Sequence, residues 1–439
     1  MKRFSLILFF VVCVSVAMAT TIPVEPGNNT LYSAVNQSQA GDVLVLSDGI
    51  YNESNKISIA YPLTNCAAEG ATPMLQMKSR IELSADLDVQ GLSFEAIDAT
   101  EAFRLVLGGE VYSLKIRRAT IKGFSSKTIR LYNTDQSAAY VDSLIIDDCL
   151  FLPSAGRCLE ASLANKQVQH LLIKNSTFDG GADGVGRLIY FNSEEGTTVE
   201  SATIDHCTFY NAQDTRGVYL GNVDGAQVSN CIFMNPEYNA DYKSYCVYGK
   251  NTLLTHSISR NADAYVRSGA QSNNVSTQDP FFVDAASGNF QLYSNSPATT
   301  MGTDGLPIGD PRWGVSEEEA DVPEGPYQPY KMPYSMSPTT SSVKVLWQMA
   351  EETKATTAIV WYGTDKENLK DSIVTDSGWM VAGEGYMHIV NIKGLQANTR
   401  YYYQVGDSKR RCEAVGSTMT APEAGTAYRI FTISDIHGN

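Results

Sequence analysis

Apolar and polar residues alternate in a short block that recurs six times between Val89 and Phe233. An aliphatic residue opens each block and an apolar residue, usually Phe, closes it five positions later; the blocks are residues 89–94, 116–121, 146–151, 173–178, 204–209 and 228–233. Their first residues are 27, 30, 27, 31 and 24 positions apart. Self-similarity at this period is typical of solenoids, and no helical period of apolar residues interrupts it. The pattern therefore predicts an all-β chain that contains a right-handed parallel β-helix.

One coil of such a helix cannot bury its inward side chains alone, so equivalent positions of successive coils must stack. We expect the residues that open the blocks to form one internal file and the closing Phe residues to form another. Polar residues occupy one equivalent turn position, and these are Asp148, Asn175, His206 and Asn230. Asn tolerates left-handed backbone, and side-chain amides stacked at a turn can hydrogen-bond along the coil axis.

A second short strand follows the block in nearly every period, and a basic residue stands just before it. The basic residues are Arg104, Lys127, Arg157, Arg187 and Arg216. Successive coils would place them about 4.8 Å apart, so on a shared face they would form a basic column. Because Arg pairs with carboxylates, the column is a candidate binding site for an acidic, uronate-bearing polysaccharide. The structural alternative is that these side chains pair with acids such as Glu160 and Asp183.

Tyrosines and cysteines also recur in the coils. Tyr190, Tyr219 and Tyr248 lie in second strands, where they would form a sugar-stacking strip if they point outward and part of the core if they point inward. Seven cysteines lie outside the N-terminal segment, and five of them repeat at two positions of the coils. An odd number leaves at least one free thiol, and the repetition favours small apolar side chains in inward stacks.

The net charge restricts the possible partners, and the N-terminal segment indicates the location of the protein. A formal net charge of −15 argues against nucleic acid. Residues 1–19 have the basic start, apolar stretch and small-residue end of a secretory signal peptide. No other apolar run is long enough to suggest a membrane span. We therefore expect a protein that is secreted, periplasmic or at the cell surface.

The two ends of the coil stack carry their own signals. Leu31–Ala40 has the pattern of a short helix, and Gly41–Tyr51 that of a strand, a turn and a strand. A helix at this end can cap the exposed edge of the first coil. The region resembles the entry to pectate-lyase-like β-helices, and residues 279–313 resemble the segment that closes them. The β-helix is accordingly predicted to cover residues 20–315, with coils that run to about Leu254.

A second module follows a linker. Residues 316–329 are charged, rich in proline and without periodicity, which predicts a linker. Alternating strands return over residues 330–421, where Trp347 and Trp361 are the expected core. Leu395–Val405 resembles the fibronectin type III stretch that sets a Tyr against the preceding corner. In detail the module resembles the N-terminal domain of purple acid phosphatases, with matches at 345–347, 360–364, 395–399 and 401–406, so we expect a C-terminal fibronectin-III-like β-sandwich.

Residues 422–439 contain an apolar strand that runs into Asp435-Ile-His437-Gly-Asn. A strand ending in Asp-x-His-Gly resembles the first metal-ligand motif of calcineurin-like metallophosphoesterases. The resemblance implies that Asp435 and His437 would be the first ligands of a metal pair of the Fe, Zn or Mn type, which activates water against a phosphate ester. Purple acid phosphatases usually carry Gly where His437 stands, so the motif fits the broader family. Two ligands cannot hold two metals, so we expect this segment to begin a truncated catalytic domain, and phosphate ester hydrolysis only in a longer chain.

The expected function is therefore that of a secreted metallophosphoesterase of the purple acid phosphatase type, with the β-helix as a glycan- or surface-targeting module. Two alternatives remain open. A polysaccharide lyase or hydrolase acting on an acidic glycan would need basic and acidic groups that converge in a groove of the β-helix. A non-catalytic glycan-binding protein would need only the binding surface.

Overall fold

The computed structural model describes residues 19–106, 111–132, 139–161, 166–191, 198–214, 216–236, 245–262, 269–320, 327–349, 358–375, 377–381, 385–407 and 410–426, and all structural statements below concern these residues. The chain forms two compact units, residues 1–320 and 321–439, and each is described by itself.

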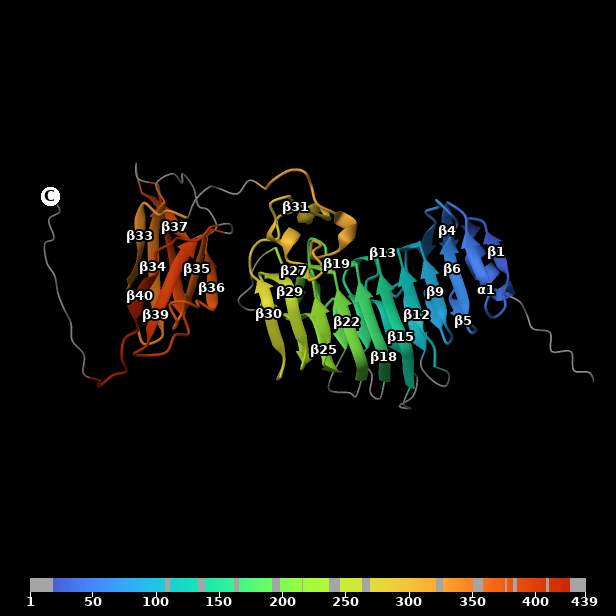
Figure 1. The fold of residues 1–439 in the computed structure, drawn as a ribbon, viewed down its shortest axis with the longest axis horizontal. Helices are drawn as coiled ribbons and strands as arrows, with labels where there is room; N and C mark the ends of the chain where they lie inside the picture. Colours follow the sequence, from blue (N-terminus) through green and yellow to red (C-terminus); the bar gives the residue numbers. More distant parts are fainter. Residues whose placement is uncertain are drawn as a thin grey trace, which may run out of the picture. The chain divides into compact units, whose positions relative to one another are not determined.

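The first unit is a parallel β-helix whose coils contribute strands to three ladders (Figure 1). The first ladder consists of β1 (Thr21–Val24), β3 (Val43–Leu46), β6 (Leu63–Ala67), β9 (Leu87–Gln90), β12 (Leu114–Arg117), β15 (Ala139–Asp147), β18 (Lys166–Lys174), β22 (Thr198–Asp205), β26 (Gln227–Ser229), β29 (Leu253–Arg260) and β30 (Gln271–Ser276). The second ladder consists of β2 (Gly27–Asn28), β4 (Ile50–Glu53), β7 (Met74–Met77), β10 (Ser93–Ala96), β13 (Thr120–Lys122), β16 (Leu150–Leu152), β19 (Thr177–Asp179), β23 (Thr208–Tyr210) and β27 (Ile232–Met234), which pairs with the end of β29.

The third ladder is an eight-stranded parallel sheet. It consists of β5 (Ile57–Ile59), β8 (Ile81–Leu83), β11 (Phe103–Val106), β14 (Lys127–Tyr132), β17 (Arg157–Ala161), β21 (Ile189–Phe191), β25 (Arg216–Asp224) and β28 (Tyr245–Lys250). A short pair, β20 (Val185–Gly186) with β24 (Ala212–Asp214), lies outside the ladders. Pairing of β29 with β30 extends the coils to Ser276, beyond the end expected near Leu254.

Each repeated block crosses a bend and so belongs to two ladders. In the block 146–151, Ile146 lies in β15, Asp148 makes the bend with φ of 54°, and Phe151 lies in β16. Positive φ recurs at this position in successive coils, at Gly91, Arg118, Asp148, Asn175, His206, Asn230, His256 and Asn274. Asn175 Nδ2 donates to Asp147 Oδ1 at 3.0 Å, across one coil. The predicted left-handed turn is confirmed, and the amides of Asn175 and Asn230 donate along the axis to Asp147 and Asp205, the residues that precede the neighbouring bends.

The predicted internal files are also confirmed. Ile146, Ile173, Ile204 and Val228 are aligned in register, and none of them is exposed to solvent. The Phe151, Phe178, Phe209 and Phe233 rings stack almost parallel, with successive centroids 4.9, 5.0 and 4.8 Å apart. This spacing matches the distance between neighbouring strands, so one residue type at one position per coil makes a continuous core.

The five repeated cysteines are buried free thiols in the same interior. Burial raises the pKa of Cys149 and of Cys246 to about 12, so both are protonated at neutral pH. They act as small apolar side chains, as expected from their repetition.

Helix α1 (Thr30–Gln37) contacts β1, β4 and β5 at the N-terminal end of the stack and buries Leu31 and Val35. Its first N–H groups lack a local side-chain cap, and Glu53 of β4 accepts hydrogen bonds from the N–H groups of Leu31 and Tyr32 at 2.9 and 3.2 Å. Among the described residues, no helix combines the length and apolar character that a membrane crossing requires.

Residues 279–320, the closing segment, fold against the outer face of the second ladder. They contain the antiparallel strands β31 (Phe282–Asp284) and β32 (Asn289–Leu292) and the 3-10 turns Ala285–Ser287, Pro297–Thr300 and Pro311–Trp313. Leu292, Ala298 and Ile308 pack on the outward Ile232 and Ile258 and form a small second core. Ser316 N–H donates to Leu292 O at 2.7 Å, so the beginning of the predicted linker still belongs to this segment.

The second unit is a sandwich of two four-stranded antiparallel sheets. One sheet has the order β33 (Lys331–Met336), β34 (Ser342–Met349), β38 (Gly385–Lys393) and β37 (Gly378–Val381). The other has the order β36 (Asp371–Thr375), β35 (Ala358–Gly363), β39 (Arg400–Gly406) and β40 (Gly416–Met419).

The sandwich core contains Trp347 but not Trp361. Trp347 is fully buried and donates its Nε1–H to the Tyr327 hydroxyl at 3.1 Å, so the core begins before residue 330. Trp361 lies half-buried under the Arg411 guanidinium, 3.9 Å from the ring centroid, which corrects its expected place. Gln396 N–H donates to the Tyr401 hydroxyl at 3.0 Å. This is the predicted contact of a Tyr with the preceding corner.

Candidate functional site

The basic residues predicted to share one column lie on the third ladder, but in two register positions. Lys127 of β14 is aligned with Arg157 of β17. Arg104 of β11 is aligned with Arg130, so its predicted equivalence with Lys127 is wrong. Arg187 precedes β21 with a left-handed φ of 53°. Arg216 opens β25, and its side chain lies outside what the structure describes.

Two buried carboxylates hold three of the predicted cations together with Arg130. Glu101, 4% exposed, lies 2.6 Å from Arg104 and 3.0 Å from Arg130. Glu160, 3% exposed, pairs with Arg157 and lies 3.6 Å from Lys127. The predicted alternative, in which the basic side chains pair with acids, is therefore confirmed for Glu160. The ion pairs hold the long basic side chains in place.

Arg187 differs from its neighbours. Among the described residues it has no ion pair, and its buried Nε has no hydrogen-bond partner. Its guanidinium lies 4.7 Å from the centroid of the Tyr190 ring, and that of Arg157 lies 4.1 Å from the same ring. We call Arg104, Lys127, Arg130, Arg157 and Arg187 the basic face. With five cations around two carboxylates, it carries excess positive charge on an acidic chain.

The recurring tyrosines continue this face. Tyr190, Tyr219 and Tyr248 are aligned in register, and each lies between inward-facing residues of its strand. The rings follow one another at 5.1 and 4.7 Å. The strip therefore points outward, although Tyr219 is itself largely covered. A sugar ring can stack on the accessible parts of Tyr190 and Tyr248.

Asp435 and His437, the predicted metal ligands, lie outside the described residues. Within the described residues, no group of three or more His, Cys, Asp or Glu side chains could hold a metal ion. The described part of the chain therefore does not fit a metal pair, and no chemical step is assigned to one.

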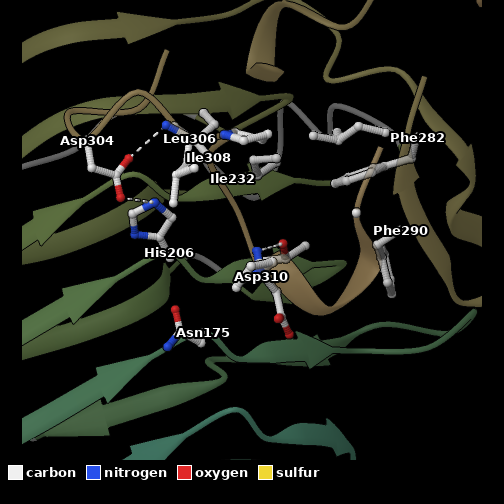
Figure 2. Close-up of a pocket in the computed structure, with 14 residues that line it drawn as sticks. Asn175, His206, Ile232, Phe282, Phe290, Asp304, Leu306, Ile308 and Asp310 are labelled. Atoms are coloured by element: carbon white, nitrogen blue, oxygen red, sulfur yellow. Dashed lines mark hydrogen bonds and ion pairs between the residues drawn. The ribbon is translucent and has the colours of Figure 1, made fainter. Parts of the chain in front are cut away.

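A second candidate site, which the sequence did not predict, is a pocket beneath the closing segment (Figure 2). It has a volume of about 220 Å³ and joins the bend residues Asn175 and His206 to residues 282–314. Its lining residues are Asn175, His206, Thr208, Ile232, Phe282, Phe290, Leu292, Asp304, Leu306, Pro307, Ile308, Asp310, Pro311 and Gly314. The only sequence signal was His206 at a turn position held by Asn or Asp in neighbouring coils.

His206 is held between two carboxylates. Its Nδ1 lies 2.9 Å from Asp205 Oδ2, and its Nε2 lies 3.5 Å from Asp304 Oδ2. The hydrogen bond to Asp205 raises the pKa of His206, and burial acts in the opposite sense. Burial raises the pKa of Asp205, but hydrogen bonds from His206, Ser229 and Asn230 outweigh burial and lower it. Both shifts favour the charged forms, so Asp205 and His206 stabilise each other as an ion pair at one end of the pocket.

Asp310 joins the closing segment to the coils. Thr177 Oγ1 donates to its Oδ2 at 2.7 Å, and its own N–H donates to Thr208 Oγ1 at 3.0 Å. Arg312 Nε lies 2.9 Å from Oδ2 without the alignment of a hydrogen bond. Burial raises the pKa of Asp310 to about 6, against the opposing effect of Arg312.

Comparison with known proteins assigns the second unit more closely than the first. Residues 329–420 match the family model of the purple acid phosphatase N-terminal domain. The second unit is thus a domain of this type, with a fibronectin-III-like sandwich fold. Residues 202–313, the last coils and most of the closing segment, match a domain of unknown function, DUF5123.

Among curated proteins, the chain is similar to purple acid phosphatase 23 of Arabidopsis thaliana, with 27% identity over 132 residues. The similarity covers 26% of this chain, and the chain spans only 27% of that relative. Among solved structures, it is similar to two structures of AlyGC, an alginate lyase of family PL6: one a mutant (TM-score 0.37, 21% identity) and one not described as a mutant (TM-score 0.33, 18% identity). The similarities cover 61% and 58% of this chain and 38% and 37% of those chains.

Proposed function

We propose that this chain belongs to a secreted metallophosphoesterase of the purple acid phosphatase type, in which the β-helix binds an acidic glycan or surface and the sandwich leads into the catalytic domain. The observation that carries the first part is the match of residues 329–420 to the purple acid phosphatase N-terminal domain. Asp435 and His437 would contribute to a metal pair completed by further ligands.

Catalysis is tested with p-nitrophenyl phosphate and with Fe³⁺, Zn²⁺ or Mn²⁺ supplied. We compare the 439-residue chain with a protein that continues past Asn439 into further Asp and His motifs. Only the longer protein should release p-nitrophenol, because two ligands cannot hold two metals. In that protein Asp435→Asn and His437→Asn should each reduce turnover. Downstream sequence without such motifs, or turnover that neither substitution affects, would contradict the proposal.

Glycan binding by the β-helix is supported by the basic face. Four of its five cations are held in fixed positions by Glu101 and Glu160, so little side-chain freedom is lost on binding. Arg187 offers a guanidinium with no ion pair of its own within the described chain. Tyr190 lies beside it as a stacking surface. An oligosaccharide that carries carboxylates is the ligand that fits both groups.

We expect the full chain to bind tetragalacturonate, measured by calorimetry, with an affinity that falls as salt is raised from 50 to about 500 mM, because salt screens exposed charges. The double variant Arg157→Ala with Arg187→Asn should bind at least tenfold more weakly. Asn is chosen at 187 because that residue has a left-handed φ. Lys122→Ala removes a half-exposed cation of the second ladder and should leave binding unchanged.

The same titration separates binding from cleavage. The acids next to the basic face are buried and paired with its cations, so they are poorly placed to act as free general bases. We therefore expect binding without release of unsaturated uronate. Release of that product, abolished in the double variant, would instead favour the polysaccharide lyase. Absence of saturable binding would remove the glycan part of the proposal and leave the phosphatase part standing.

A further inference from the structure

The pocket beneath the closing segment has a polar end and an apolar end. Figure 2 shows His206 and Asp304 on one side and Phe282 and Phe290 on the other. Ile308 belongs to the apolar lining between them. A cavity of about 150 Å³ with apolar walls holds benzene. At about 220 Å³ this pocket has room for a six-membered ring with several substituents.

The polar end of the pocket combines a charged imidazole with hydrogen-bond acceptors. Asp205 accepts from His206 Nδ1–H at 2.9 Å, and in the charged ring Nε2 carries the second proton toward Asp304, 3.5 Å away. His206 is 7% exposed, and among the described residues its Nε2 makes no hydrogen bond of normal length. Asn175 Nδ2 already donates to Asp147, which leaves its carbonyl oxygen for the pocket.

Asp304 adds a carboxylate at the same end. Its Oδ1 accepts the N–H of Leu306 at 3.0 Å, and its Oδ2 lies 3.5 Å from His206 Nε2. A ligand donor placed beside Asp304 would therefore meet a carboxylate oxygen, and a ligand hydroxyl can accept from His206 Nε2–H. The set selects a ligand that carries both a cationic donor and hydroxyl groups.

The charges around the pocket exclude an anion. Arg312 pairs with Asp148 and Asp310. Among the described residues that line the pocket, His206 is then the remaining cation against Asp205 and Asp304. An anionic ligand would add a like charge at this acidic end, whereas an ammonium group would offset the excess. The pocket is thus opposite in charge preference to the basic face.

We propose that this pocket binds a monosaccharide-sized amino sugar, with its ammonium group directed to Asp304, its hydroxyl groups to His206 and Asn175, and its apolar ring face against Phe282 and Ile308. This site is independent of the phosphoesterase proposal. It is also distinct from the basic face, because it lies on the second ladder and disfavours uronates.

The test uses the full chain and three probes, D-glucosamine, methyl α-D-glucoside and D-glucuronate, followed by saturation-transfer NMR. Glucosamine should show saturable binding, and glucuronate should bind at least tenfold more weakly or not at all. Asp304→Asn should bring the affinity for glucosamine down to that for the glucoside. Asp304 is well exposed, so this variant should fold normally.

A matched pair of variants tests the role of His206. His206→Asn keeps a residue that accepts left-handed backbone, as Asn175 and Asn230 do at the same position, and it should reduce glucosamine affinity at least tenfold. His256→Asn makes the same change at a bend outside the pocket and should leave affinity unchanged. The proposal is overturned if none of the probes binds, if glucuronate binds as well as glucosamine, or if the two histidine variants behave alike. Loss of tetragalacturonate binding in the basic-face variant has no bearing on these outcomes.

Discussion

Phe178→Ala is expected to lower the free energy of unfolding by roughly 3–5 kcal/mol. The Phe178 ring is buried and stacks on both Phe151 and Phe209, at 4.9 and 5.0 Å. Its removal leaves a cavity and breaks two ring contacts, each worth about 0.5–1.5 kcal/mol beyond the buried area. Because coils contact only their neighbours, the defect interrupts the core in the middle of the stack. Denaturant unfolding followed by circular dichroism measures the change.

Two control variants test whether the loss of stability comes from the stacked Phe rings or from any substitution in this region. Phe178→Leu keeps most of the apolar volume and should cost less than about 1.5 kcal/mol. Lys174→Ala, in the strand before it, removes a half-exposed ion pair with Asp147 and should cost about 0–1 kcal/mol. A Phe178→Ala effect no larger than that of Lys174→Ala would mean that the stacked rings do not carry the core.

Asp310→Asn is expected to change how stability depends on pH. Burial raises the folded-state pKa of Asp310 from 3.8 to about 6. The folded protein therefore holds this proton more tightly than the unfolded chain does. The resulting stabilisation is fully present below pH 3.8 and is lost as the pH rises through about 6. A shift of about two units corresponds to about 3 kcal/mol.

The difference in unfolding free energy between the parent protein and Asp310→Asn should consequently fall by roughly 2 kcal/mol between pH 4 and pH 7, because part of the stabilisation is already lost at pH 4. Urea unfolding at several pH values measures it, and the Asn variant cancels contributions from other groups. A difference that grows with pH would show that Arg312 stabilises the carboxylate more than burial penalises it.

Some features of the fold could be predicted from spacings between residues in the sequence. Ile146, Ile173 and Ile204 recur at spacings of 27 and 31 residues, and only stacking buries them all. Tyr401 was identified by its distance from the corner at Leu395, which is also a local relation. By contrast, Arg104 was placed in register with Lys127, three residues away from its true partner Arg130, because coil lengths vary and sequence spacing alone does not fix register.

The candidate sites also contain features that the sequence predicted and features that it did not. The tyrosine strip followed from the repeat, and only its outward direction needed coordinates. The partner of Arg104 and Arg130, Glu101, was missed because an isolated acid carries no periodic signal. The pocket was missed entirely, because it is formed by residues far apart in the chain.

The sequence by itself determined the repeating architecture, the two modules and the files of side chains that run through the coils. These features depend on the repeat period and on the local pattern of residues, and both recur in every coil. Only the tertiary structure decided that Thr177 meets Asp310, a contact across 133 residues, and that His206 faces Asp304. Such contacts arise where a segment without repeats folds back on the stack, and they are set by the packing of Ile308 and Leu292 on Ile232 rather than by any spacing in the chain.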